Sequence, residues 1–347
     1  MRRTLIELSE VAEFTRLRAS AKNAYKAKFT KQGLLKPNAG LNFMLDLDEH
    51  IVTLQREILT QTYRPGHFRH FWICDRKPRF ISAAPFRDRV VHHSLCSLLL
   101  PRLERYADHH SYACRPQRGL HRALHYAQNQ TRRYGWALRL DIAHYFETVN
   151  HELVKQQLRR LFKGKQALAL ADLFIEHAPQ GCQAGQGLPI GNLTSQHFAN
   201  MFLGQVDHAL RHEFKVGAYL RYMDDLTIFA QSKSELHEAH HFVKYFVEQK
   251  LKLQLKESAT RLGPCHLGVP LLGFRVFPTH IRFDRSRMKR YRQKRAFLDQ
   301  KWKVYGEHDQ LRARSEALSA WASVANTFTM RQRHSQRLSR QSEQESE

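Results

Sequence analysis

Long hydrophobic runs and paired cysteines are both missing from this sequence. No apolar stretch is long enough to cross a bilayer, and the first residues, 1–7, carry no apolar block typical of a signal peptide. The five cysteines lie far apart, are odd in number and form no C-x-x-C pair. A disulfide framework and a zinc ribbon are therefore not indicated, and we expect a soluble protein with no membrane partner.

Acidic side chains are also scarce. The sequence has 32 Asp and Glu against 56 Lys and Arg, which gives a formal net charge of +24. This excess favours a polyanionic partner, although charge alone does not distinguish nucleic acid from an anionic membrane. Because 42% of the 347 residues are hydrophobic, the chain can still bury a core, and we expect one body with subdomains.

Two neighbouring carboxylates, Asp224 and Asp225, stand between an aromatic-rich segment and an apolar, partly β-branched one, 226–230. This pattern predicts a tight hairpin with the acids at its turn. Because adjacent carboxylates are costly to bury unless a cation neutralises them, the pair indicates a divalent metal. An acidic turn between two surface strands would have the same pattern, but a second strand ending in an acid, 136–141, favours the metal.

That second acid, Asp141, follows an apolar strand, a position that suits a metal ion facing a phosphate. Tyr145 and Phe146 come next. A ring five residues after the acid could pack beneath a bound sugar and leave no room for a 2′-hydroxyl. Two aromatics that simply pack a following helix would have the same sequence.

A glycine-rich segment, 185–191, lies between the two acid motifs. Its glycines allow close backbone approach, and residues 192–195 are expected to cap a helix that runs through Leu203. A glycine loop is weak evidence alone, and its place between the acids makes it informative.

Basic residues gather in two further segments. A hairpin over 67–81 presents Lys77 and Arg79 on one face, either for an anion or as a solvated edge strand. The loop 111–120 carries two arginines that can lie along a sugar-phosphate strand, or it is an ordinary connector. Apolar periodicity predicts the remaining elements. They are a helical segment over 5–31, helices over 46–60, 85–101, 120–133, 235–251, 285–303 and 311–328, and strands over 253–256 and 269–277.

The order of strand and Asp141, glycine loop, then Tyr222-Met223-Asp224-Asp225 resembles the palm of a reverse transcriptase, over about 46–328. The chain resembles more narrowly the reverse transcriptases of diversity-generating retroelements. Ser195-Gln196 is the most specific feature, since group II intron and retron relatives usually carry Ser-Pro there. The other matching segments are Lys77-x-Arg79-x-Ile81, 85–91, 111–115 and 190–196.

The resemblance implies an α+β fold of the right-hand polymerase type, with fingers, a palm of antiparallel sheet plus helices, and a short helical thumb. It also implies a cytoplasmic protein of a prokaryotic cell or phage. The expected divisions are an N-terminal helical extension over 1–45, fingers over 46–135, a palm over 136–280 with a fingers insertion at about 155–185, a thumb over 281–330 and a disordered tail over 331–347.

The resemblance further implies a two-metal site. Asp141 and Asp224 would bind two Mg²⁺ ions, for which Mn²⁺ is a possible substitute, with the Ile142 carbonyl completing the shell and Asp225 as a weaker third acid. One ion would lower the pKa of the primer 3′-hydroxyl, and the other would steady the triphosphate and the leaving pyrophosphate. Mg²⁺ keeps phosphates and waters as ligands, so a few carboxylates suffice.

Other roles are also implied by position in the family's motifs. Phe146 matches the steric gate that selects deoxynucleotides, and Lys256 is placed as a proton donor to pyrophosphate. Ile190 stands where many reverse transcriptases carry Gln, and the resemblance implies low fidelity opposite template adenines. The nucleotide-binding candidates are Lys77, Arg79, His144, Tyr145, Phe146, Ile190, Gly191, Gln196 and Lys256. The template and primer candidates are Arg87, Tyr112, Arg115, Arg118 and the primer grip Leu272, Gly273 and Phe274.

The expected function is therefore RNA-directed DNA synthesis, with template RNA, cDNA, the RNA–DNA hybrid and dNTPs as partners and a small basic accessory protein beside them. A defence-associated or group II intron-like reverse transcriptase stays open, although the latter would normally carry maturase parts after the thumb. An RNA-dependent RNA polymerase must accept a 2′-hydroxyl, which Phe146 disfavours. A non-catalytic RNA-binding protein would explain the charge of +24 but would not need Asp141 and Asp224.

Overall fold

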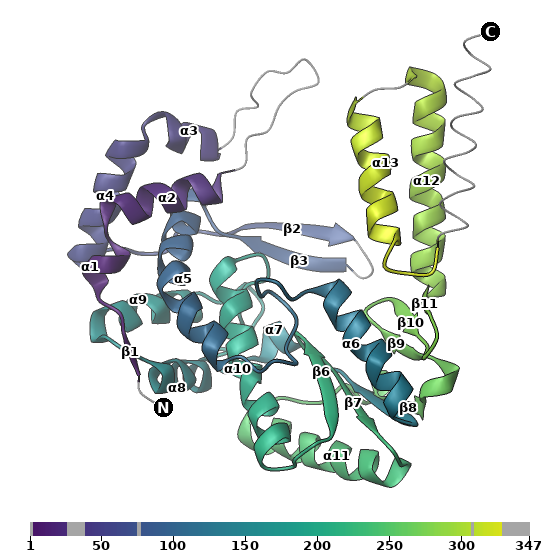
Figure 1. Cartoon of the computed structure of the whole chain (residues 1–347). Coiled ribbons are helices and arrows are strands. Elements are labelled where there is room, and N and C mark those ends of the chain that lie inside the picture. Colours follow the sequence, from purple (N-terminus) through teal and green to yellow (C-terminus); the bar gives the residue numbers. More distant parts are fainter. Residues whose placement is uncertain (1–2, 26–38, 75–77, 307–308, 328–347) are drawn as a thin grey trace.

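The computed structural model describes residues 3–25, 39–74, 78–306 and 309–327 (Figure 1). Helices surround small sheets that are antiparallel except for the parallel pair β1/β5, so the expected α+β class is confirmed. No helix among these described residues is both long and apolar enough to cross a membrane. The N-terminal part contains β1 (Thr4–Leu5), α1 (Leu8–Val11), α2 (Phe14–Ala24), α3 (Ala39–Leu45), α4 (Leu47–Leu59), β2 (Arg69–Cys74), β3 (Pro78–Ala83), α5 (Phe86–Tyr106) and α6 (Leu120–Arg133).

A four-stranded antiparallel sheet forms the centre of the molecule. Its strands are β4 (Trp136–Leu140), β6 (Ala218–Tyr222), β7 (Asp225–Ala230) and β8 (Arg261–Pro264), in the order β6-β7-β4-β8. Side chains alternate between its faces, as in any strand. Leu138 and Ile228 belong to one buried cluster, whereas Ala137 and Phe229 belong to another. The sheet therefore has an apolar core on each face.

Helices cover both faces of this sheet. α11 (Lys233–Tyr245) packs on β7 and β4, and α6 packs on β6. α10 (Leu193–His212) packs along α5, where Gly204 allows close approach because a Cβ there would come within 2.7 Å of the Tyr106 ring. The same core includes α7 (Tyr145–Thr148), α8 (His151–Leu161), β5 (Phe162–Lys163), α9 (Lys165–Glu176) and the π-helix η1 (Phe246–Lys250).

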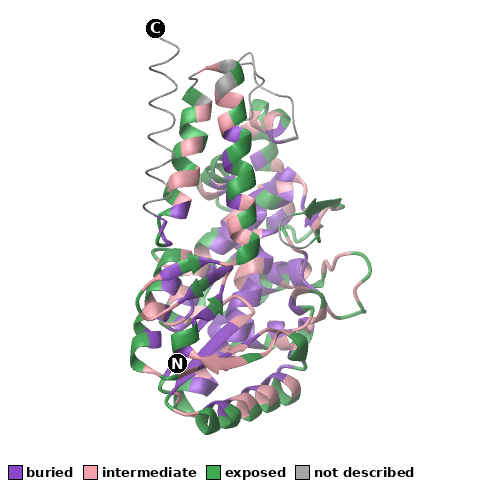
Figure 2. Cartoon of the chain, turned by 90° about the vertical axis from the view of Figure 1, so that its right-hand side faces the viewer, coloured by how far each residue is buried: buried purple, intermediate pink, exposed green. Residues whose placement is uncertain are grey.

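The C-terminal part begins with a three-stranded antiparallel sheet. It contains β9 (Val269–Leu271), β10 (Phe274–Val276) and β11 (Ile281–Phe283), preceded by the 3-10 turns η2 (Glu257–Ala259) and η3 (Cys265–Leu267). The helices α12 (Arg285–Tyr305) and α13 (Asp309–Ala322) then rise from one end of the molecule (Figure 1). Buried residues concentrate around the central sheet, whereas these two helices are largely exposed or intermediate (Figure 2).

Several predicted elements differ from those observed. The single strand expected over 269–277 is the β9/β10 hairpin, because Leu272 and Gly273 have left-handed φ values of 49° and 83° and reverse the chain. No strand forms over 253–256, where Leu255 only bridges Ile142. These short apolar runs have the composition of a strand, but their pairing depends on distant backbone.

Helix ends also differ from expectation. α5 continues through Pro101 to Tyr106, since the packing of its last turn outweighs the missing N–H donor. α11 ends at Tyr245 and gives way to η1, and α13 ends at Ala322 rather than near 328. The part of the first helical segment at 26–31 and the tail at 331–347 lie outside the described residues.

Candidate active site

The acid pair lies where β6 turns into β7. Tyr222 pairs with Asp225 across the hairpin, and Met223 and Asp224 form its turn. Met223 has a left-handed φ of 57°, which lets two residues reverse the chain. The tight hairpin expected from the sequence is therefore present, with Asp224 at its tip.

Asp141 and Asp224 line one small cavity together with Ile142. Asp141 follows β4, and its carbonyl accepts a hydrogen bond from the Lys256 backbone N–H at 2.8 Å. Burial and the neighbouring charge of Asp141 raise the pKa of Asp224 to about 6. The structure thus brings together two residues 83 positions apart, and their mutual repulsion is the condition that a bound cation relieves.

Asp225 has a different partner from its neighbour. Its carboxylate accepts from Arg139 Nε at 2.9 Å, and these two strand residues are on β7 and β4. Within the described parts of the chain, no group of three or more His, Cys, Asp and Glu side chains has the arrangement of a metal site. The role of Asp225 as a third metal ligand stays a prediction.

The β2/β3 hairpin brings a cation to the acids. Arg79 is exposed on β3, and its positive charge lowers the pKa of Asp224 slightly, against the larger effects of burial and the charge of Asp141. Its predicted partner Lys77 lies outside the described residues. One of the two basic residues expected to meet a triphosphate is thus near the acid pair.

The turn after Asp141 positions the aromatic candidates. His144 is exposed and has a left-handed φ of 48°. Tyr145 is 2% exposed, and its hydroxyl donates to the Ala199 carbonyl at 2.6 Å, so its side chain belongs to the core. Phe146 is partly buried and meets the Tyr145 ring edge-on, with centroids 5.6 Å apart. Of the two adjacent rings Tyr145 and Phe146, Phe146 is therefore the one that stays partly accessible.

The glycine loop is joined to β3. The Ser82 N–H donates to the Ile190 carbonyl at 3.0 Å, and Gly191 approaches so closely that a Cβ would lie 2.8 Å from Ile81 Cγ2. Asn192 directly precedes α10, but its side chain makes no capping bond to the helix, contrary to our expectation. Its amide instead donates to the Ser82 carbonyl at 3.0 Å and accepts from the Ala84 N–H at 3.1 Å. Asn192 therefore connects the loop to the hairpin.

Gln196 is partly buried on the first turn of α10. Its side-chain oxygen lies 3.7 Å from Cys114 Sγ, and Cys114 Sγ lies 4.0 Å from Met223 Sδ. The candidate Gln196 is thus connected through one cysteine to the turn that carries Asp224.

The arginines expected to meet the template are engaged within the protein. Arg87 pairs with Glu57. Arg115 pairs with Glu104 at 3.0 Å and donates to the Ser111 carbonyl at 2.9 Å, with its side chain 7% exposed. These contacts support loop structure, and a template role for either arginine stays a prediction.

Two other template candidates form a stacked pair. Tyr112 is 4% exposed, and the Arg118 guanidinium lies 5.9 Å from its ring centroid. The partly exposed Arg118 is therefore the more accessible of the two.

The predicted primer grip lies at the junction with α12. Leu272 and Gly273 form the β9/β10 turn, and Phe274 begins β10. The Arg287 guanidinium of α12 lies 4.4 Å from the Phe274 ring centroid. The left-handed φ of 83° at Gly273 favours glycine, and a Cβ there would lie 2.6 Å from Nε of the flexible Arg287 side chain, which would have to move.

One residue near the acids was missed from the sequence. Arg221 lines the cavity of Asp141 and Asp224 and is 2% exposed. It forms a buried ion pair with Asp207 of α10. The signal was present, because a charged residue interrupts the otherwise apolar and aromatic strand that precedes the acids.

Known proteins resemble this chain in sequence and in fold. The chain is 25% identical over 280 residues to Protein YkfC of Escherichia coli (strain K12), covering 68% of this chain and 73% of that protein. Two telomerase structures show lower similarity. Apo telomerase from Candida tropicalis, truncated from the C-terminal domain, has a TM-score of 0.49 at 11% identity over 68% of this chain. Telomerase from Candida albicans with a TWJ fragment of telomeric RNA has a TM-score of 0.48 at 8% identity over 64%.

The chain spans 60% and 46% of the lengths of these two telomerase chains. The family model described as reverse transcriptase (RNA-dependent DNA polymerase) matches residues 74–276, more than half of the chain. Members of this family use divalent metal ions. With its mixed helices and antiparallel sheets in a right-hand polymerase fold, the chain belongs to the reverse transcriptase family and is an RNA-directed DNA polymerase, a nucleotidyltransferase.

Proposed function

We propose that this reverse transcriptase copies a template RNA into cDNA by two-metal nucleotidyl transfer and is of the diversity-generating type, error-prone opposite template adenines. The observation that carries the catalytic part is the shared cavity of Asp141 and Asp224. The subfamily rests on the motif at 190–196, Ile-Gly-Asn-Leu-Thr-Ser-Gln.

The acid pair fits divalent cations. Burial and the charge of Asp141 raise the pKa of Asp224, which means that the surroundings do not fully neutralise the two carboxylates. Carboxylate oxygens are ligands that suit Mg²⁺ or Mn²⁺. Asp141, Asp224 and the Ile142 carbonyl would hold the ions, with Asp225 as a weaker contributor. When bound, Mg²⁺ would lower the pKa of the primer 3′-hydroxyl and neutralise the charge of the pyrophosphate leaving group.

Residues around the acids would bind the incoming dNTP. Arg79 would pair with the triphosphate, as would Lys77, and the backbone N–H groups of His144 and Tyr145 would assist. Phe146 would exclude a 2′-hydroxyl. The backbone N–H of Lys256 donates a hydrogen bond to the Asp141 carbonyl, and the Lys256 side chain would donate a proton to pyrophosphate.

Adenine errors are assigned to the glycine loop. The backbone of Ile190 is bonded to Ser82, and Gly191 contacts Ile81 of β3, so the loop and the hairpin that carries Arg79 form one unit. Isoleucine has no hydrogen-bonding side chain, so the site would select a base pair by shape alone at this point. Gln196 would contact the nucleotide from the first turn of α10, which follows the loop.

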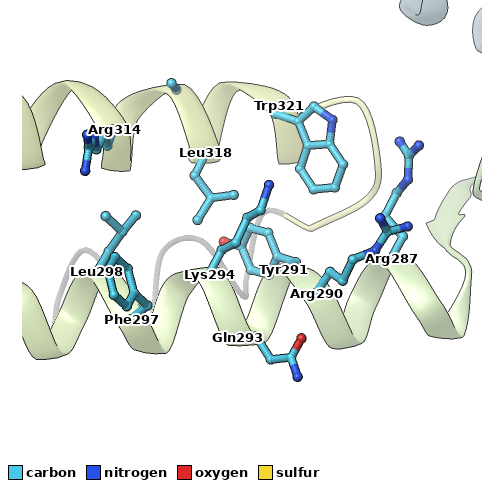
Figure 3. Close-up of a pocket in the computed structure, with 11 residues that line it drawn as sticks. Arg287, Arg290, Tyr291, Gln293, Lys294, Phe297, Leu298, Arg314, Leu318 and Trp321 are labelled. Carbon is cyan, nitrogen blue, oxygen red and sulfur yellow. The ribbon is translucent and has the colours of Figure 1, made fainter. Parts of the chain in front are cut away.

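The nucleic acid would lie between the hairpin and the C-terminal helices. A cavity of about 680 Å³ between α12 and α13 is lined by cationic and aromatic side chains (Figure 3). Four of them are Arg290, Lys294, Arg314 and Trp321. This lining supports binding of a polyanion, such as the RNA–DNA hybrid.

Further parts of the proposal follow the same family pattern. The expected fingers, palm and thumb divisions apply to 46–135, 136–280 and 281–330. Arg87, Tyr112, Arg115, Arg118 and the primer grip at 272–274 would contact template and primer. A small basic accessory protein would be a further partner.

Primer extension on a defined RNA template tests the proposal. We expect incorporation of dNTPs in preference to rNTPs, dependent on Mg²⁺, with an error rate that is highest opposite adenines. Ile190→Gln should lower the adenine error several-fold while leaving errors opposite the other bases unchanged. An unchanged adenine spectrum would contradict the role of Ile190, and RNA binding without any dNTP incorporation would contradict the catalytic assignment.

A further inference from the structure

A buried ion pair lies beneath the turn that carries Asp224. Arg221, the fourth residue of β6, is 2% exposed, and Asp207 of α10 is 0% exposed. Arg221 Nε lies 2.9 Å from Asp207 Oδ1, and Arg221 Nη2 lies 2.6 Å from Oδ2. Two nitrogens thus bind one carboxylate, a fork geometry that holds the guanidinium in a single orientation.

The remaining nitrogen of this guanidinium reaches the turn itself. Arg221 Nη1 donates to the Met223 carbonyl at 3.0 Å and to Asn200 Oδ1 at 2.8 Å. Met223 has a φ of 57° and directly precedes Asp224. A left-handed conformation is unfavourable for a residue with a side chain. A contact to the carbonyl of that residue therefore stabilises a turn that the chain does not favour locally.

Arg221 also attaches the loop before α6. Its Nη2 donates to Ser111 Oγ at 3.0 Å, and its backbone N–H donates to the His110 carbonyl at 2.8 Å. The Tyr112 N–H donates in return to the Arg221 carbonyl at 2.9 Å. One residue therefore connects the turn, α10 and this loop.

Stability alone does not require such a pair. Desolvation offsets most of the attraction between buried charges, so apolar residues of similar volume would often serve as well. What apolar residues cannot supply is a directed donor for the Met223 carbonyl. The contacts of Arg221 therefore indicate that its side chain orients the turn at Met223 and Asp224.

We propose that Arg221 is a positioning residue, which holds the Met223 carbonyl so that the Asp224 carboxylate faces Asp141 across their cavity. The inference rests on the proposed function, because it concerns how Asp224 is presented to a divalent cation. Lysine keeps the charge opposite Asp207 but has a single nitrogen, which cannot contact Asp207, Met223 and Ser111 together.

The variant Arg221→Lys in the full chain tests this role. We expect kcat for dNTP incorporation to fall about 10-fold or more, as for residues that orient metal ligands, with KM and hybrid affinity near wild type. Mn²⁺ binding without nucleotide, followed by electron paramagnetic resonance, should weaken about 10-fold. Asn200→Ala, which removes one acceptor of Nη1 and keeps the ion pair, should shift both measurements in the same direction by less.

Arg211→Lys is the matched control, since Arg211 pairs with Asp108 at 2.7 Å from the same helix α10. It should leave kcat and Mn²⁺ binding unchanged. Wild-type kcat and Mn²⁺ affinity in a folded Arg221→Lys would overturn the inference. If Arg221→Lys does not fold, unchanged values in Asn200→Ala overturn it. An inactive wild type would count against the proposed function, while Mn²⁺ binding would still test the role of Arg221.

Discussion

The two faces of the central sheet carry similar ion pairs in different surroundings. On one face, the side chains of Arg221 and Asp207 are 2% and 0% exposed. On the other, those of Arg139 and Asp225 are 25% and 20% exposed. The same chemistry is thus fully desolvated on one side and partly hydrated on the other. Asp224 and Asp225 are adjacent in sequence, yet Asp224 lines the cavity with Asp141 whereas Asp225 pairs with Arg139.

The largest effect should separate the two neighbouring acids. Asp224→Asn removes a charge from the cavity shared with Asp141, and we expect dNTP incorporation to fall on the order of 10³-fold, equivalent to several kcal/mol of transition-state stabilisation. Asp225→Asn, whose carboxylate is bonded to Arg139, should lose about 10-fold. Single-turnover primer extension measures both. Equal losses would mean that the structural difference between the two acids has no catalytic consequence.

The second test compares the stability of the two ion pairs. Asp207→Ala leaves the Arg221 charge buried without its partner, and we expect the free energy of unfolding to fall by about 3 to 5 kcal/mol. Arg139→Ala should cost about 1 kcal/mol or less, because water screens its pair. Urea unfolding of both variants measures the contrast. Similar losses would show that burial does not distinguish the faces.

The smallest effect concerns a buried histidine between α5 and α9. Burial, followed by the charges of His93, His177 and Arg89, lowers the pKa of His92 to about 3. His92 is therefore neutral when folded and takes up a proton below about pH 6.5 only when unfolded. Between pH 7 and pH 5 the free energy of unfolding should therefore fall by about 2 kcal/mol, because each pH unit below 6.5 costs up to about 1.4 kcal/mol.

The variant His92→Phe isolates that contribution. Urea unfolding at pH 7, 6 and 5 should show a shallower acid dependence in the variant than in the wild type. Parallel slopes for wild type and His92→Phe would contradict the assignment.

Local patterns sufficed for much of the architecture. The helix predicted over 120–133 is α6 with the same bounds, and the hairpin at Asp224 forms as expected, because apolar periodicity and turn chemistry act within a few residues. Local patterns failed where a residue's hydrogen-bond partner lies far away in the sequence. Asn192 has the sequence of a helix cap, yet it bonds β3, more than 100 residues earlier.

The candidate site shows the same contrast. The acids were predicted from the ends of two strands, and Arg221 stands out in the sequence as a charge within an apolar strand. The role of Arg221 could not be predicted, because its partner Asp207 lies 14 residues away on another element. Arg87 and Arg115 appeared available for nucleic acid, but each pairs with a glutamate that only the folded chain brings near.

The amino-acid order by itself determined the basic charge, the helical stripes and the presence of Asp141, Asp224 and Asp225 at strand ends. Only the tertiary structure decided which acid joins Asp141 and which pairs with Arg139, 86 positions from Asp225. The physical reason is that strand residues alternate between faces, while the partners on each face come from distant parts of the chain.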